Sequence, residues 1–242
     1  MTRTDDGPRA LLWDMDGTLL DSEQLWDVAL ADLARHLGGE MTQEVRDGQV
    51  GASLRDAVHG LLGHLGLPVT EAATAEAGDW LTTRTAELFA AGIPWRPGAQ
   101  QALELAPAAG WPQALVTNTG RTLTEDALGT LGRHHFAATV CGDEVAEGKP
   151  APDPYRRGAA LLGGAPADCL AVEDSPTGAA AAEAAGCAVL VVPLEVAVPG
   201  GPRRTHRDTL VGLSRADLVA AWRAAGTRAG GGPGPAWDDP RP

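Results

Sequence analysis

The hydrophobic residues of this chain follow a strand pattern at its start, a helical pattern over residues 22–91, and an alternation of both afterwards. Residues 11–13 form a short apolar run before Asp14, which is typical of a buried strand. From Ser22 to Gly38 the apolar residues recur at helical spacing until two glycines end the segment. Three more helices are expected, at Met41 to Asp47, Leu54 to Leu65 and Thr70 to Ala90. No strand pattern interrupts them, so residues 22–91 are predicted to form a helical insert.

After Trp95, strands rich in Val and Leu alternate with helices. The expected strands are Ala114 to Thr117, Ala137 to Cys141, Cys169 to Val172 and Ala188 to Val192, and the expected helices are Gln100 to Ala109, Thr122 to Leu131, Pro154 to Leu162 and Thr177 to Ala185. This alternation predicts an α/β fold, a parallel sheet with helices on both faces and a ligand site outside the carboxyl ends of the strands. Residues 1–21 and 92–225 would form this core domain. The Gly- and Pro-rich residues 226–242 lack apolar periodicity and are expected to be disordered.

The composition excludes several classes of function. A net charge of −13, from 19 basic and 32 acidic residues, disfavours nucleic acid and anionic membranes as partners. The first residues lack the apolar core of a signal peptide, and no apolar run is long enough to span a bilayer, so a cytoplasmic protein is expected. The three cysteines have no metal-ligand spacing and are interpreted as small buried residues.

Two carboxylates lie at the end of the first strand. Asp14 and Asp16 are two positions apart, so strand alternation would direct both to one side. Gly17 allows the backbone to turn sharply, and Thr18 follows with a hydroxyl. Paired carboxylates at a strand end are costly unless a cation lies between them, and a hard divalent ion such as Mg²⁺ suits oxygen ligands. An Asp-rich turn is the alternative.

Polar residues follow two later strands as well. Thr117 and Asn118 end the second strand of the core, where a turn-forming role would also explain them. Glu173 and Asp174 end a buried strand, and a cation shared with Asp14 would relieve the repulsion between these adjacent acids.

The stretches that carry these residues resemble the four signatures of the haloacid dehalogenase (HAD) superfamily, in the family's order. They are D-M-D-G-T-L-L-D-S-E from Asp14, A-L-V-T-N ending at Asn118, C-G-D-E-V followed by K-P-A-P-D-P-Y up to Tyr155, and L-A-V-E-D-S-P-T-G from Leu170. The resemblance implies a Rossmann-like core with a small helical cap, which the insert would form. The small-cap members that the chain resembles are sugar- and polyol-phosphate phosphatases, phosphoglycolate phosphatase and β-phosphoglucomutase.

The resemblance also implies roles for individual residues. Asp14 would attack phosphorus to form an aspartyl-phosphate, and Asp16 would act as general acid and then general base. The phosphate would be bound by Thr117, Lys149 and the amides near Met15 and Asn118. Pro150 and Pro152 stiffen the loop that carries the lysine.

The same resemblance implies which residues would bind the metal and which would contact the substrate. Mg²⁺ would be held by the Asp14 carboxylate, the Asp16 carbonyl and Asp174, with Glu173 in the inner or the second coordination shell. Related enzymes contact substrate from a cap loop, which makes Ser53 and Arg55 candidates. A helix N-cap and a solvated arginine explain these two residues equally well.

The function expected from the resemblance is Mg²⁺-dependent hydrolysis of a small phosphomonoester, with a sugar or polyol phosphate favoured and phosphoglycolate or a nucleotide monophosphate still open. The alternatives are a β-phosphoglucomutase-like phosphomutase and a non-catalytic HAD-like binding module. Asp21 to Val28 contains no histidine, whereas the mutase group has one there, and this favours water as the final phosphoryl acceptor. The partner is expected to be a phosphorylated metabolite, and the protein a monomer or weak dimer.

Overall fold

The computed structural model describes residues 7–47, 52–194 and 196–229. Within these residues the strands are β1 (Ala10–Trp13), β2 (Gln113–Val116), β3 (Ala138–Val140), β4 (Cys169–Glu173), β5 (Ala188–Val191) and β6 (Arg204–His206). They form one parallel sheet in the order β3-β2-β1-β4-β5-β6, which confirms the predicted α/β class. The strand order reverses between β1 and β4. In open parallel sheets, ligands bind outside the carboxyl ends of the strands at such a reversal.

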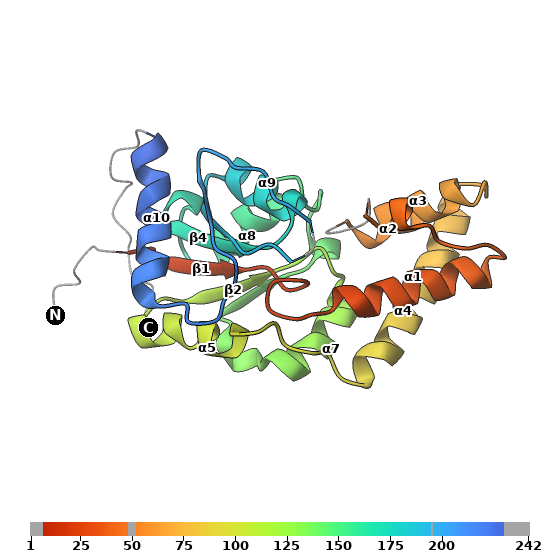
Figure 1. Ribbon diagram of the computed structural model, residues 1–242, viewed down its shortest axis with the longest axis horizontal. Helices are drawn as coiled ribbons and strands as arrows, with labels where there is room; N and C mark the ends of the chain where they lie inside the picture. The colour runs from red at the N-terminus through yellow and green to blue at the C-terminus, as the bar shows by residue number, and fades with distance from the viewer. Residues whose placement is uncertain (1–6, 48–51, 195, 230–242) are drawn as a thin grey trace.

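Helices cover both faces of the sheet (Figure 1). The helices after the insert are α5 (Ala99–Leu103), α6 (Leu105–Ala109), α7 (Arg121–Leu131), α8 (Asp153–Leu161), α9 (Pro176–Ala185) and α10 (Arg215–Ala229). Alternation along β1 directs Leu11 and Trp13 into the cluster with α5, α7 and α10, and Leu12 into the cluster with α8 and α9. Trp13 is fully buried, and its indole N–H donates to the side-chain oxygen of Gln113 at 2.7 Å.

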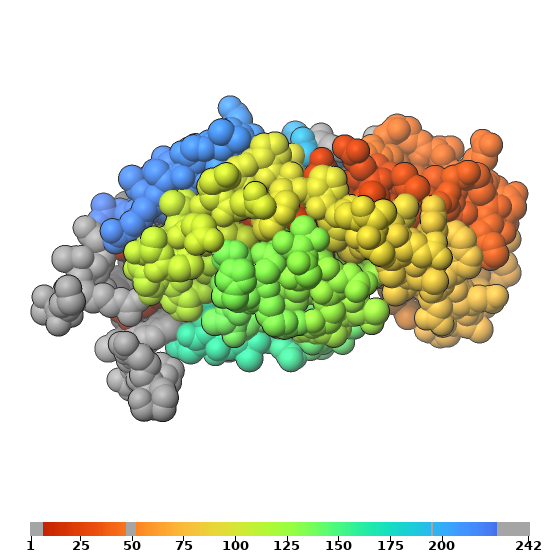
Figure 2. Space-filling model, turned by 90° about the horizontal axis from the view of Figure 1, so that it is seen from below, coloured from red at the N-terminus to blue at the C-terminus, as the bar shows by residue number. Residues whose placement is uncertain are grey.

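The insert has a hydrophobic cluster of its own. Its helices are α1 (Glu23–His36), α2 (Gln43–Asp47), α3 (Leu54–His64) and α4 (Glu71–Ala90). Leu33, Val58 and Leu81, one from each long helix, are fully buried within this cluster. Each such side chain contributes roughly 1.5–3 kcal/mol when removed from water, which is enough to hold the helices together. Figure 2 shows the insert helices in orange at one end of the molecule, beside the green surface of α7.

Four elements differ from the sequence prediction. The helix expected over 100–109 is divided at Glu104, because Pro107 cannot donate to the carbonyl of Leu103 and its ring crowds that carbonyl. Strand β6 was not predicted, since its three residues are polar and lie at the sheet edge. Helix α10 was not predicted either, and it continues to Ala229. The disorder expected from residue 226 is therefore wrong for 226–229, while 230–242 lie outside the described residues.

The cysteines are buried and unpaired, as predicted: Cys141, Cys169 and Cys187. Among the described residues, no helix combines the length and hydrophobicity that crossing a bilayer requires.

Candidate active site

The carboxyl ends of β1 and β4 and the loop before α8 bring three buried charges into contact. The Nζ of Lys149 donates to Oδ1 of Asp14 at 2.6 Å and to Oε1 of Glu173 at 2.7 Å. The lysine is 4% exposed and the two acids are 6% and 0% exposed, so water screens these ion pairs weakly. Burial alone would lower the pKa of Lys149, but the charges of Asp14 and Glu173 raise it above its ordinary value. The lysine is therefore held as a cation.

Glu173 is enclosed by protein donors and not directed at an open position. Its Oε1 also accepts from the hydroxyl of Tyr155, and its Oε2 accepts from the hydroxyl of Ser175 at 3.3 Å. A Cβ on Gly178 would lie 1.9 Å from Oε1, so only glycine leaves room for this carboxylate. The predicted metal-ligand role of Glu173 therefore competes with contacts that position Lys149. Ser175 caps α9 as its sequence suggested, accepting from the Gly178 amide at 3.0 Å.

Asp14 and Asp174 form an acidic pair that fits a cation. Oδ2 of Asp14 is buried and finds no hydrogen-bond donor among the described residues. Burial, with the charge of Glu173, raises the pKa of Asp14 to about 7, although Lys149 opposes the shift. Burial and the charges of Asp14 and Glu173 also raise the pKa of Asp174 well above its usual range. One oxygen from each of Asp14, Glu173 and Asp174 lies within 4.8 Å of the others. A divalent ion between these carboxylates would remove the repulsion.

The turn after β1 is shaped around Asp174. Gly17 has φ +78°, and a Cβ there would lie 2.2 Å from Oδ2 of Asp174. Both the left-handed backbone and the close approach require glycine. The Thr18 hydroxyl donates to Oδ1 of Asp174 at 3.2 Å, which secures the β1 turn to the end of β4.

Asp16 is held by donors from two directions. From the start of the insert, the Ser22 hydroxyl and the Trp26 indole N–H donate to Oδ1 at 2.6 Å and 3.2 Å. From the loop after β2, the hydroxyls of Thr117 and Thr119 donate to Oδ2 at 3.2 Å and 2.7 Å. The sequence analysis assigned Thr117 to this site but missed Thr119. The sequence feature that could have indicated Thr119 is its hydroxyl, two positions after that of Thr117.

Asn118 acts through Lys149. Its side-chain oxygen accepts from the Lys149 amide at 2.8 Å, and its nitrogen donates to the Lys149 carbonyl at 3.1 Å. This reciprocal clamp fixes the backbone of the lysine across 31 positions of sequence. The side chain of Asn118 is thus committed to the loop, and only its backbone amide retains the phosphate-binding role expected of it. Met15 is fully buried in the core, so it too could reach a phosphate only through its backbone.

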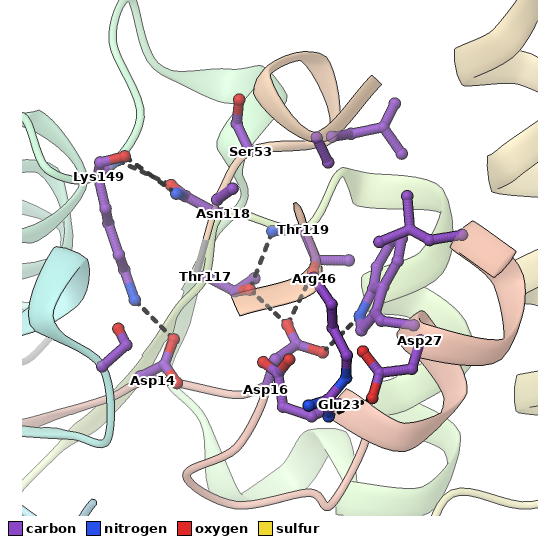
Figure 3. A pocket seen from close by; sticks show the side chains of 16 residues that line it. Asp14, Asp16, Glu23, Asp27, Arg46, Ser53, Thr117, Asn118, Thr119 and Lys149 are labelled. Atoms are coloured by element: carbon purple, nitrogen blue, oxygen red, sulfur yellow. Dashed lines mark hydrogen bonds and ion pairs between the residues drawn. The ribbon is translucent and has the colours of Figure 1, made fainter. Parts of the chain in front are cut away.

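A pocket lies between these residues and the insert (Figure 3). Its core side includes Asp14, Asp16, Thr117, Asn118, Thr119, Lys149 and Ser175. Its insert side includes Glu23, Trp26, Asp27, Leu30, Arg46, Ala52, Ser53, Leu54 and Ala57.

Of the two insert residues predicted to contact the substrate, Ser53 lines the pocket and Arg55 does not. Ser53 lines the pocket while also capping α3, accepting from the Asp56 amide at 3.2 Å. Arg55 is not among the lining residues; it is half-exposed and pairs with Glu71. The arginine that does line the pocket is Arg46 on α2, which the sequence analysis did not select because a charged residue on a short helix is usually solvated.

The fold and this site define a class of protein that sequence and structure comparisons identify. Residues 8–186 match the family model of haloacid dehalogenase-like hydrolases. The protein CbbY of Rhodobacter capsulatus is 35% identical over 198 residues, covering 77% of this chain and 86% of CbbY. Hexitol phosphatase A of Escherichia coli is 34% identical over 190 residues, covering 76% of this chain and 82% of that enzyme. A crystal structure of CbbY from Rhodobacter sphaeroides in complex with phosphate superposes with a TM-score of 0.77 at 29% identity, covering 87% of this chain and 99% of that chain.

The chain belongs to the haloacid dehalogenase-like hydrolase family. The predicted family membership and the prediction of an enzyme, a phosphoric monoester hydrolase, are confirmed.

Proposed function

We propose that this chain hydrolyses small phosphomonoesters through a covalent phosphate on Asp14, with Mg²⁺ as the metal and a sugar or polyol phosphate as the substrate. The observation that carries the proposal is the environment of Asp14 at the pocket. One of its oxygens is paired with a buried lysine, and the other is buried without a donor among the described residues. A nucleophilic carboxylate needs one oxygen free to attack while its other oxygen is held in orientation.

The acidic pair supports a resident metal ion. Asp14 and Asp174 would hold Mg²⁺, which supplies positive charge to the phosphate oxygens when bound. Lys149 adds a second positive charge beside Asp14, and Glu173 with Tyr155 keeps that charge in place. Phosphoryl transfer depends mainly on in-line positioning and charge neutralisation, and Lys149 with the metal ion would supply the positive charge.

The reaction would proceed in two steps, in which Asp14 is the nucleophile and Asp16 transfers the protons. An Asp14 oxygen forms a bond to phosphorus while the ester P–O bond breaks, and the protonated Asp16 carboxyl gives its proton to the leaving alkoxide. Asp16, now a carboxylate, takes a proton from water as the water oxygen attacks phosphorus. The bond to Asp14 breaks, releasing inorganic phosphate.

The contacts of Asp16 favour hydrolysis over phosphoryl return to a sugar. The group that reaches Asp16 from α1 is the indole of Trp26, which donates a hydrogen bond and does not titrate. It can orient Asp16 but cannot exchange a proton with it. Water is therefore proposed as the second acceptor, in agreement with the absence of a histidine from Asp21 to Val28.

A phosphate-release assay tests the proposal. Metal-free protein is given Mg²⁺ and a panel of phosphomonoesters that includes p-nitrophenyl phosphate, hexitol phosphates, sugar phosphates and phosphoglycolate. Release that requires Mg²⁺ and disappears in Asp14→Asn is expected. Turnover that survives either EDTA or Asp14→Asn would contradict the proposal. With β-glucose 1-phosphate and a bisphosphate primer, rapid formation of glucose 6-phosphate without phosphate release would instead identify a mutase.

A further inference from the structure

The insert side of the pocket carries three charged residues, Glu23, Asp27 and Arg46, that have no role in the proposed phosphate transfer. Glu23, Trp26, Asp27 and Leu30 occupy positions i, i+3, i+4 and i+7 of α1 and therefore share one helix face. Arg46 reaches the same wall from α2. Figure 3 shows the carboxylates of Glu23 and Asp27 and the guanidinium of Arg46 converging below Asp16. These five residues are called the insert wall.

The charge of the insert wall is unfavourable for an anion. Arg46 is its single basic residue among the described lining residues, and it already forms an ion pair with Asp27. The two side chains are 22% and 25% exposed, so the pair is partly shielded from solvent. Glu23 adds a second carboxylate to this wall, and its charge contributes to the raised pKa of Asp174. Two carboxylates thus oppose one guanidinium on this wall.

The two carboxylates of the insert wall also limit which substrate groups can form hydrogen bonds with it. Ionised Glu23 and Asp27 only accept hydrogen bonds. A substrate hydroxyl can donate to them and accept from Arg46 or from the Ser53 hydroxyl nearby. A carboxylate or a second phosphate on the substrate can only accept hydrogen bonds, so Arg46 and Ser53 could donate to it, but Glu23 and Asp27 could form no hydrogen bond with it and would repel its charge.

We infer that the insert wall selects phosphomonoesters whose end remote from the phosphate is an uncharged, hydroxyl-bearing chain, and that it rejects those with a second acidic group. Glu23, Asp27 and Arg46 are the specificity-determining residues. The inference rests on the proposed function and narrows its substrate to neutral polyol and sugar monophosphates, against acidic phosphates and bisphosphates.

A matched pair of substrates tests the inference. Glucitol 6-phosphate and gluconate 6-phosphate differ only at carbon 1, where a CH₂OH group replaces a carboxylate. The expected ratio of kcat/KM is at least about tenfold in favour of glucitol 6-phosphate, the equivalent of ~1.4 kcal/mol. p-Nitrophenyl phosphate serves as the reference because it has no acidic remote group. Loss of its hydrolysis would refute the proposed function, whereas normal hydrolysis with equal rates on the matched pair would refute only the inference.

Variants that change the charge of the insert wall in opposite directions provide a second test. Asp27→Asn releases Arg46 from its ion pair and should reduce the ratio several-fold, mainly by lowering KM for gluconate 6-phosphate. Arg46→Gln leaves the carboxylates unopposed and should increase the ratio. Glu23→Gln provides an independent reduction if Asp27→Asn fails to fold.

Asp32→Asn is the matched control. Asp32 lies on the same helix, pairs with Arg35 and Arg84, and does not line the pocket. It undergoes the same charge change and should leave the ratio as in the wild type. A ratio that moves equally in Asp32→Asn and Asp27→Asn, or that moves in the same direction in Asp27→Asn and Arg46→Gln, would overturn the assignment.

Discussion

Replacing Asp14 by Asn should stabilise the metal-free protein at neutral pH while it abolishes turnover. The side chain is 6% exposed, and its Oδ2 has no donor among the described residues. Burial, with the nearby charge of Glu173, raises its pKa from 3.8 to about 7. The folded protein therefore disfavours the ionised carboxylate. Asn has nearly the same shape as protonated Asp, so it removes the charge without leaving a cavity.

The size and the sign of the effect follow from proton linkage. Between pH 3.8 and about 7 the folded state keeps a proton on Asp14 that the unfolded state releases, so the free energy of unfolding falls as pH rises through this window. Because each tenfold change in acidity is worth ~1.4 kcal/mol, the wild type would lose on the order of 4 kcal/mol by pH 7. The Asn variant has no such titration. Its advantage should be absent below pH 4 and largest above pH 7.

Urea denaturation in EDTA measures this difference for the wild type and Asp14→Asn at several pH values between 4 and 8. Subtracting the two curves removes the titration of groups remote from Asp14, and the difference reports Asp14 together with Lys149 and Asp174, whose pKa values depend on its charge. Adding Mg²⁺ should reverse the order at pH 7.5, because the ion stabilises the wild-type carboxylates and has one fewer charged ligand in the variant. A difference that does not change with pH, or a wild type that is the more stable protein in EDTA at pH 7.5, would refute the reasoning.

Three further substitutions, one of them with a matched control, test the roles of neighbouring groups. Asp16→Asn should slow phosphorylation by an alkyl phosphate by roughly 10²–10⁴-fold and by p-nitrophenyl phosphate much less, because nitrophenolate leaves without a proton; equal losses in rapid-quench measurements would argue against the acid role. Tyr155→Phe removes a donor to the buried Glu173 carboxylate, so the free energy of unfolding should fall by roughly 1.5–3 kcal/mol. Its kcat should be reduced with KM little changed, and an unchanged kcat would exclude a role of Tyr155 in positioning Lys149 through Glu173. Gly178→Ala would force a Cβ against Glu173 and should destabilise the protein by roughly 1–3 kcal/mol. Gly129→Ala, in a helix with nothing within 4 Å of the new Cβ, should stabilise it by about 0.4–1 kcal/mol; thermal melts that rank these two variants in the other order would contradict the packing around Glu173.

The sequence alone determined the class of fold and the chemical centre of this protein. An apolar run ended by Asp14, a second ended by Thr117 and a third ended by Glu173 and Asp174 predicted parallel strands whose carboxyl ends meet. They do meet, because parallel strands in one sheet place all these ends on the same edge. The helical character of residues 22–91 was also predicted, since their apolar residues have helical spacing and no strand pattern intervenes.

The roles of several site residues depended on contacts between distant segments. Asp14 and Lys149 are 135 positions apart, and Asp16 and Thr119 are 103 apart. No local pattern indicates which donors reach a given carboxylate. Glu173 illustrates the consequence. Its position at the end of a strand predicted a role in the inner or second coordination shell of a metal, and only the structure shows that its oxygens also accept from donors at three other positions of the chain.

The wall of the pocket opposite the catalytic residues was decided by tertiary structure alone. Arg46 and Arg55 lie in similar helical surroundings in the sequence, yet only Arg46 lines the pocket, while Arg55 pairs with Glu71 outside it. Which side of a surface helix faces a ligand is set by how that helix packs on its neighbours, and the helical period specifies only the apolar side. A charged residue is tolerated both in solvent and at the rim of a polar pocket, so its own identity carries no information about which of the two it occupies.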